Sequence, residues 1–144
     1  MNPAMFEAGF PEVQNESVRQ FKKAKVRTQN GDIGGGNGSL LIAALNRNPK
    51  LRGTLFDLAP VIERARPNFA KAKLESRCDV VSGDFFKSGP AGADVYLMRH
   101  IIHDWYDDRC LTILKNIHRA AKPGAKLLVV ETIIPPGNEP GFAK

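Results

Sequence analysis

Residues 32–45 read DIGGGNGSLLIAAL, a glycine-rich turn that runs directly into an apolar segment. Glycines at alternate positions, Gly34, Gly36 and Gly38, let the backbone turn tightly and approach a ligand closely. The apolar segment 39–45 predicts a helix, whose first backbone amides would face the same ligand. The stretch therefore predicts a ligand-binding loop between a strand and a helix.

The spacing of the glycines separates two classes of cofactor. A dinucleotide fingerprint, G-x-G-x-x-G, would need a third glycine where Ser39 stands. The pattern here is instead acid-x-G-x-G-x-G, and it begins at Asp32. It suits S-adenosylmethionine, whose amino-acid tail tolerates a nearby acid. We therefore predict this cofactor and assign Asp32, Gly34 and Gly36 to its site.

Turn signals and apolar runs alternate regularly from about residue 31 onward. Pro67 is expected to kink or divide one predicted helix, and Asp104 or Asp107 to cap the next. Strands that alternate with helices imply an α/β fold, in which helices cover both faces of a parallel sheet. The predicted strands span 53–58, 78–84, 94–98 and 126–134, the last buried on both faces, and the predicted helices span 61–74 and 111–121.

The segment before the glycine loop does not fit this pattern. Residues 25–31 contain one good β-former and two positive charges, Lys25 and Arg27. Burying unpaired charge at the centre of a sheet would cost on the order of several kcal/mol. We therefore expect residues 1–30 to be a polar, basic and poorly ordered segment, and residues 31–144 to form a partial S-adenosylmethionine-binding domain.

Two acids follow successive predicted strands. Asp57 can accept hydrogen bonds from both ribose hydroxyls of a nucleoside, and Asp84 can accept one from an adenine amino group. Phe85 would then pack on the adenine ring. A plainer interpretation makes the glycines a tight turn and the acids helix caps. Two acids at neighbouring strand ends favour the cofactor site.

Residues 99–108, RHIIHDWYDD, follow another predicted strand. Methyl transfer to oxygen needs a base near the acceptor hydroxyl, and His103 suits that role because its ordinary pKa lies near working pH. Glu131, at the next strand end, could bond the other ring nitrogen. Arg99 could pair with the carboxylate of the cofactor's methionine tail.

Other interpretations of this segment stay open. His103 could be a loop histidine that caps the following helix, and Trp105 could simply pack in the core. His100, His103, Asp104 and Asp107 have a spacing that permits a metal site. No other ligand cluster supports that site, so no metal is predicted.

Four motifs together carry a family resemblance: DIGGGNG, LFDLAPVIERA, GDFF and the long run MRHIIHDWYDDRCLTILKNIHRAAKPGAKLLVVE. Over residues 32–135 they resemble the cofactor-binding domain of caffeic-acid and acetylserotonin O-methyltransferases. The resemblance implies a class I methyltransferase fold, with a Rossmann-like parallel sheet, that uses S-adenosylmethionine. It also implies that small aromatic or polyketide-like acceptors are methylated on a hydroxyl.

The resemblance also implies roles for individual residues. His103 matches the family's general base, and Glu131 matches one of two acids that flank it. Arg99 stands where many members carry lysine. The positions that match the family's cofactor contacts are Gly34, Asp57, Asp84, Phe85 and Arg99.

Parts of the family pattern have no counterpart in the sequence. Family members are homodimers through an N-terminal helical domain, and they continue beyond Glu131 with pocket helices, two further strands and a second acid. We therefore expect a sheet that lacks the last strands. The alternative function is a truncated, non-catalytic fragment or subunit that needs a partner chain.

Composition bounds the remaining possibilities. The 144 residues carry a formal net charge of +6 and include two cysteines. A basic run at 19–27 could serve a nucleic-acid methyltransferase, but such runs are usually solvated faces, so no nucleic-acid partner is predicted. No apolar run is long enough for a membrane span. A cytoplasmic protein with reduced cysteines and a small-molecule acceptor is expected.

Overall fold

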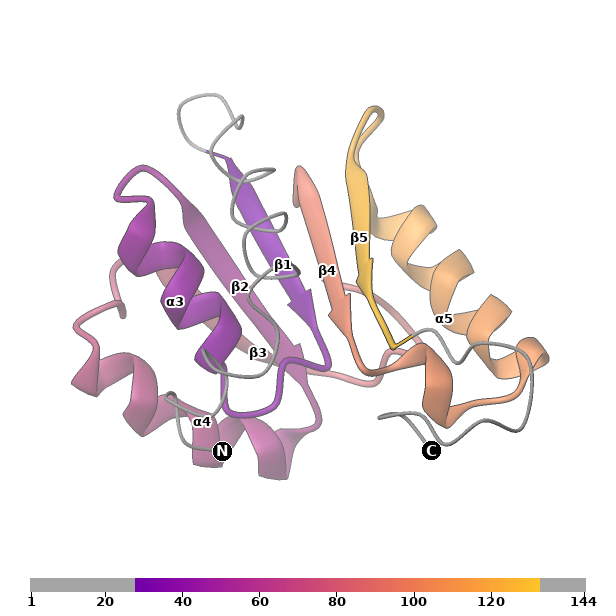
Figure 1. The fold of residues 1–144 in the computed structure, drawn as a ribbon, viewed down its shortest axis with the longest axis horizontal. Helices are drawn as coiled ribbons and strands as arrows, with labels where there is room; N and C mark the ends of the chain where they lie inside the picture. Colours follow the sequence, from indigo (N-terminus) through magenta and orange to yellow (C-terminus); the bar gives the residue numbers. More distant parts are fainter. Residues whose placement is uncertain (1–27, 133–144) are drawn as a thin grey trace, which may run out of the picture.

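Five parallel strands form one sheet in the order β3-β2-β1-β4-β5 (Figure 1). The computed structural model describes residues 28–132. The strands are β1 (Gln29–Ile33), β2 (Arg52–Asp57), β3 (Cys78–Ser82), β4 (Val95–Arg99) and β5 (Lys126–Val130). The helices are α3 (Ser39–Arg47), α4 (Ala59–Lys71) and α5 (Asp107–Ala120), with a short 3-10 helix, η1 (Ile102–Asp104).

Helices cover both faces of the sheet, as predicted. On β2, Leu55 packs in a buried cluster with α3 and α4, whereas its neighbour Phe56 packs in a second cluster with α5. Successive side chains of a strand point to opposite faces, so the two clusters are the two sides of one sheet. The expectation of an α/β fold with a two-sided parallel sheet is confirmed.

The strand directly before the glycine loop exists, which the sequence analysis did not predict. β1 lies at the centre of the sheet and pairs with β2 on one side and β4 on the other. Gln29 is its first residue, and Lys25 and Arg27 lie outside the described residues. The boundary predicted at residue 30 therefore falls inside β1.

Two finer predictions were wrong, and one of the two alternatives for Pro67 is excluded. Pro67 does not divide its helix, because α4 runs from Ala59 to Lys71 with Pro67 inside it. Neither predicted acid caps α5: its N-cap residue is Tyr106, and Asp107 stands in the first turn, where its charge favours the helix dipole. Within residues 28–132, β5 pairs with β4 alone, which leaves Val129 48% exposed rather than buried.

Membrane insertion finds no support in residues 28–132, where every helix is too short or too polar to cross a bilayer.

Two polar side chains are buried in the central strand. Asn30 is 0% exposed and Asp32 is 2% exposed. Both side-chain polar atoms of Asn30, and Oδ2 of Asp32, have no hydrogen-bond partner among the described residues. Burial raises the pKa of Asp32 to about 7, the charge of Arg99 lowers it, and the charge of Asp57 raises it. A carboxyl group at the end of β1 therefore reduces the stability of the fold when it ionises.

We expect Asp32→Asn to stabilise the chain at pH 8. The pKa of Asp32 rises from 3.8 to about 7 on folding. The free energy of unfolding therefore has its full value, as far as Asp32 is concerned, below about pH 3.8. The ionisation of Asp32 lowers it progressively as the pH rises to about 7. At 1.36 kcal/mol per pKa unit, the loss is on the order of a few kcal/mol.

Thermal unfolding at pH 5 and pH 8 tests this. The gain in melting temperature should be larger at pH 8, and Asp79→Asn, at an exposed position on β3, should show no such difference. A variant no more stable than the original chain at pH 8 would contradict the buried-charge account.

Candidate active site

The glycine loop leaves β1 in a conformation that requires glycine. Gly34 and Gly38 have φ of +64° and +79°, in the left-handed region. A Cβ atom on Gly34 would lie 2.5 Å from Cδ1 of Ile101, and one on Gly38 would lie 2.4 Å from the ring of Phe69. The loop therefore packs closely both on the segment after β4 and on α4.

A cavity of about 330 Å³ opens between this loop, the start of α3 and the end of β4. Four predicted cofactor residues line it: Asp32, Gly34, Gly36 and Arg99. Its other lining residues, which the sequence analysis did not assign, are Gly35, Asn37, Ser39 and Leu40. Their position between the glycines and the first helical turn was a signal that could have identified them.

An acidic and a basic side chain, Asp32 and Arg99, line this cavity. Burial lowers the pKa of Arg99, while the charge of Asp32 raises it. In turn, the charge of Arg99 lowers the pKa of Asp32 and so favours its charged carboxylate form. The cavity can therefore receive a ligand that carries a positive and a negative group, such as an amino acid.

Asp57, Asp84 and Phe85 are not among the residues that line the cavity. Asp57 Oδ2 accepts a hydrogen bond from the backbone N–H of Gly36 at 2.9 Å, so it supports the loop directly. Asp84 Oδ1 accepts one from the backbone N–H of Phe86 at 2.9 Å. The ring of Phe85 lies near Gly34, 3.5 Å from where a Cβ atom there would be. All three residues are at the loop end of the sheet, as predicted.

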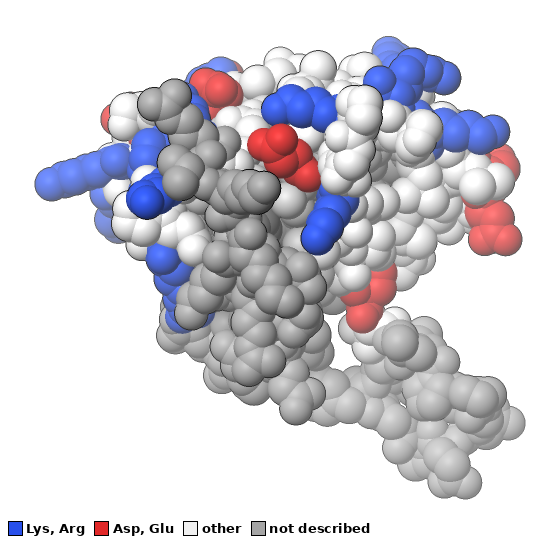
Figure 2. All heavy atoms as spheres, turned by 90° about the horizontal axis from the view of Figure 1, so that it is seen from above, with Lys and Arg blue, Asp and Glu red and all other residues white. Residues whose placement is uncertain are grey.

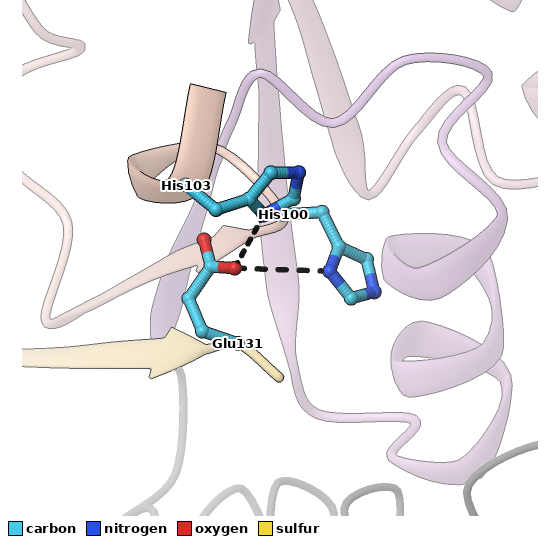
Figure 3. A group of neighbouring side chains, drawn as sticks. All are labelled: His100, His103 and Glu131. Atoms are coloured by element: carbon cyan, nitrogen blue, oxygen red, sulfur yellow. Dashed lines mark hydrogen bonds and ion pairs between the residues drawn. The ribbon is translucent and has the colours of Figure 1, made fainter. Parts of the chain in front are cut away.

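His103 and Glu131 are in contact (Figure 3). Nδ1 of His103 lies 2.6 Å from Oε2 of Glu131. The other carboxylate oxygen, Oε1, accepts a hydrogen bond from the backbone N–H of Ile102 at 3.0 Å. Glu131 therefore holds both the backbone of η1 and the imidazole that η1 carries.

The ionisation of this pair is coupled. The hydrogen bond to Glu131 raises the pKa of His103, and the charges of Glu131 and Asp104 raise it further. Burial alone would raise the pKa of Glu131, but the hydrogen bond and charge of His103 lower it below its ordinary value. The two residues favour a protonated imidazole beside an ionised carboxylate.

The structure tests two interpretations left open by the sequence, that His103 caps α5 and that Trp105 packs in the core. His103 lies in η1 and does not cap α5, whose N-cap residue is Tyr106. Its Nε2 lies 3.1 Å from Oδ1 of Asp104. Trp105 is 40% exposed and packs edge-on against Phe86, so it is not a core residue.

The histidine cluster differs from the metal set considered from spacing. Among the described residues, His100 and His103 gather with Glu131, and Asp104 and Asp107 are not members of the group. Nδ1 of His100 lies 3.8 Å from Oε2 of Glu131. This contact could not be predicted from the sequence because it depends on the pairing of β4 with β5.

Comparison with known proteins places this site in a family. The family model of the O-methyltransferase domain matches residues 8–142. Mitomycin biosynthesis 6-O-methyltransferase of Streptomyces lavendulae is 50% identical over 103 residues, which are 72% of this chain and 30% of that protein. Aclacinomycin 10-hydroxylase RdmB of Streptomyces purpurascens is 50% identical over 100 residues, which are 69% of this chain and 27% of that protein.

A solved structure agrees with the fold. The O-methyltransferase NcsB1 from neocarzinostatin biosynthesis, in complex with S-adenosylmethionine and 2-hydroxy-5-methyl naphthoic acid, superposes with a TM-score of 0.71 at 32% identity. The match covers 90% of this chain and 42% of that one. The sheet is thus that of the class I S-adenosylmethionine methyltransferases. This chain spans about 30% of the length of the curated relatives it matches. With the family model matching almost its whole length, the chain belongs to the O-methyltransferase domain family.

Proposed function

We propose that this chain binds S-adenosylmethionine and belongs to an enzyme that methylates a hydroxyl of a small aromatic or polyketide-like acceptor, with His103 as the general base. The observation that carries the proposal is the 2.6 Å contact between Nδ1 of His103 and Oε2 of Glu131. This pair follows the ends of β4 and β5, and Ile101 links it to the glycine loop through its close approach to Gly34. The proposed proton acceptor thus follows β4, the strand whose last residue, Arg99, lines the cavity.

The residues of the cavity fit S-adenosylmethionine. Oδ2 of Asp32 is a buried acceptor with no partner among the described residues, which suits the ammonium of an amino-acid tail. Arg99 suits its carboxylate. Asp57, Asp84 and Phe85 are proposed to hold the nucleoside. When bound, S-adenosylmethionine supplies a methyl group on a positively charged sulfur.

Glu131 defines which nitrogen of His103 acts as the base. The Nδ1–H donates to Glu131, so Nε2 is the nitrogen that accepts the proton of an acceptor hydroxyl. Asp104 Oδ1 lies 3.1 Å from Nε2 and must turn aside to admit the hydroxyl. Its side chain is 59% exposed, so this rotation meets little resistance. Glu131 then stabilises the imidazolium that forms.

The acceptor class is supported by the relatives and by the surface. One relative is named for mitomycin biosynthesis, and the NcsB1 structure holds a hydroxynaphthoic acid. On the face shown in Figure 2, Lys and Arg side chains are scattered among acidic and uncharged residues. The basic run at residues 19–27 lies outside the described residues. A small-molecule acceptor is favoured over nucleic acid.

Two alternatives need to be distinguished. A relative that is 50% identical is named a hydroxylase, so related sequences serve more than one reaction. A non-catalytic fragment or subunit that binds cofactor and needs a partner chain is the other alternative. We also propose that the enzyme to which this chain belongs is a homodimer, as the family resemblance implies.

Asp57→Ala should abolish cofactor binding. The variant loses the proposed ribose contact and also the carboxylate that holds the N–H of Gly36. Calorimetric titration with S-adenosylhomocysteine measures the loss, with the exposed Asp79→Ala as the control. Unchanged affinity in Asp57→Ala would remove this residue from the cofactor site.

His103→Gln should lower methyl transfer by about 100-fold or more, because a positioned general base contributes about 10² to 10⁴. Its affinity for S-adenosylhomocysteine should stay unchanged. The assay incubates the full chain with S-adenosylmethionine and a 2-hydroxynaphthoic acid, and mass spectrometry reads the product. His118→Gln, at an exposed position on α5, is the matched control.

The product distinguishes the alternatives. A mass gain of one CH₂ supports methyl transfer, whereas a gain of one oxygen supports hydroxylation. Cofactor binding without turnover in the original chain favours the non-catalytic alternative. Full activity in His103→Gln would rule out the general-base role.

Glu131→Gln should bring the pKa of His103 back toward its ordinary value of about 6.5. The hydrogen bond to the carboxylate raises this pKa, and a neutral amide removes the charge that favours the imidazolium. A nuclear magnetic resonance titration of the imidazole signals measures the change, and His118 in the same spectra serves as the reference. An unaltered His103 pKa would contradict the coupling.

A further inference from the structure

Three side chains with metal-binding atoms converge beyond the carboxyl ends of β4 and β5 (Figure 3). One ligand atom from each of His100, His103 and Glu131 lies within 4.8 Å of the other two. Glu131 Oε2 is 2.6 Å from Nδ1 of His103 and 3.8 Å from Nδ1 of His100. The proposed methyl transfer uses His103 and Glu131 but gives His100 no task.

The backbone of His100 is held in an unusual conformation that keeps it in this cluster. Its φ is +54°, a left-handed value that few residues other than glycine adopt. Its N–H donates to the carbonyl of Val130 at 3.0 Å, which extends the β4–β5 ladder by one residue. The register that pairs Arg99 with Val130 therefore sets His100 beside Glu131. Such strained positions persist where the surrounding structure enforces them, and they cluster at functional sites.

We propose that His100, His103 and Glu131 bind one Zn²⁺ or similar first-row transition-metal ion, in place of the proton shared by His103 and Glu131. Ligand atoms about 2.0–2.1 Å from a tetrahedral zinc ion are roughly 3.3 Å apart. The observed separations of 2.6 and 3.8 Å lie on either side of this value. Shifts of less than about 1 Å would bring these two separations to that value, and the two imidazole nitrogens, within 4.8 Å of each other, would also have to draw closer.

The donor set selects the class of metal. Two imidazole nitrogens and one carboxylate oxygen suit zinc, nickel or copper, whereas magnesium and calcium prefer oxygen ligands alone. The side chains of His100 and His103 are 41% and 50% exposed. Water can therefore reach the ion and fill its fourth position.

Asp104 does not bind the metal in this arrangement but contacts one of its ligands, His103. Its Oδ1 lies 3.1 Å from Nε2 of His103, the nitrogen that would not bind the metal. Histidines that bind a metal through one nitrogen usually donate the other N–H to a carboxylate or carbonyl, which fixes the ring. The structure already places that carboxylate.

Metal binding and proton removal would use the same pair of side chains. An ion on Nδ1 of His103 and Oε2 of Glu131 takes Glu131 away from its role in orienting the base. Zinc should therefore inhibit methyl transfer, a consequence that rests on the proposed function. The binding itself does not depend on it.

Calorimetric titration of the full chain with Zn²⁺ tests the site. The diagnostic variant is His100→Asn, because asparagine tolerates a left-handed backbone but lacks the imidazole. His118→Asn is the matched control, since His118 is the third and last histidine of the sequence. In the original chain, nuclear magnetic resonance of the imidazoles should show zinc-dependent shifts at His100 and His103 but not at His118.

Saturation at one ion per chain is expected, with His100→Asn weaker by at least about tenfold and His118→Asn unchanged. Loss of an outer-shell partner alone costs about 10- to 100-fold in affinity, so loss of a ligand should cost no less. Equal affinity in His100→Asn, equally large shifts at His118, or no saturable binding would each overturn the site. Because binding is measured without turnover, failure of the metal site and failure of the proposed function are separate results.

Discussion

The pairing of β1 with β2 on one side and with β4 on the other fixes where the rest of the site lies. The chain moves outward from β1 to β3 and then returns to the other side of β1, and ligands of such sheets bind at this reversal. The backbone N–H of Gly34 donates to the carbonyl of Phe56 at 2.8 Å, so the β1–β2 ladder continues into the glycine loop. The loop geometry is thus an extension of the sheet, and Arg99 reaches the same cavity because β4 is the other neighbour of β1.

The carboxylate of Glu131 positions η1 and His103 relative to the sheet. Glu131 follows β5, and its two oxygens bind the backbone of Ile102 and the ring of His103. Its side chain is 18% exposed, whereas that of His103 is 50% exposed. The more buried and better-anchored group therefore orients the more exposed one. The same contacts make the imidazole a stronger base and hold it in one tautomer.

The sequence predicted the features that depend on residues close together along the chain or at the ends of strands. The glycine loop, the acid that ends β2 and the contact between His103 and Glu131 could be predicted because strand ends of a parallel sheet gather at one edge. The strand Gln29–Ile33 could not, because pairing on both sides secures its place and Ile33 is its one apolar side chain. The exposure of Val129 and the left-handed backbone of His100 likewise depend on which strand pairs with β5 and in what register.

The shared fold does not by itself decide the reaction. Two relatives, each 50% identical to this chain, are named for methylation and for hydroxylation, so a sheet and loop of this kind accommodate both. Function depends on the chemistry of the site and not on the fold alone, so the residues around the acceptor are one place where the two reactions can differ. In this chain the proposed general base is His103, whose ring lies between two carboxylates, at 2.6 Å from Glu131 and 3.1 Å from Asp104. Under the proposal, Nδ1 keeps its proton toward Glu131, and Nε2 can accept one from a hydroxyl only when Asp104 moves away. Asp104 is the more exposed of the two acids and the easier to displace.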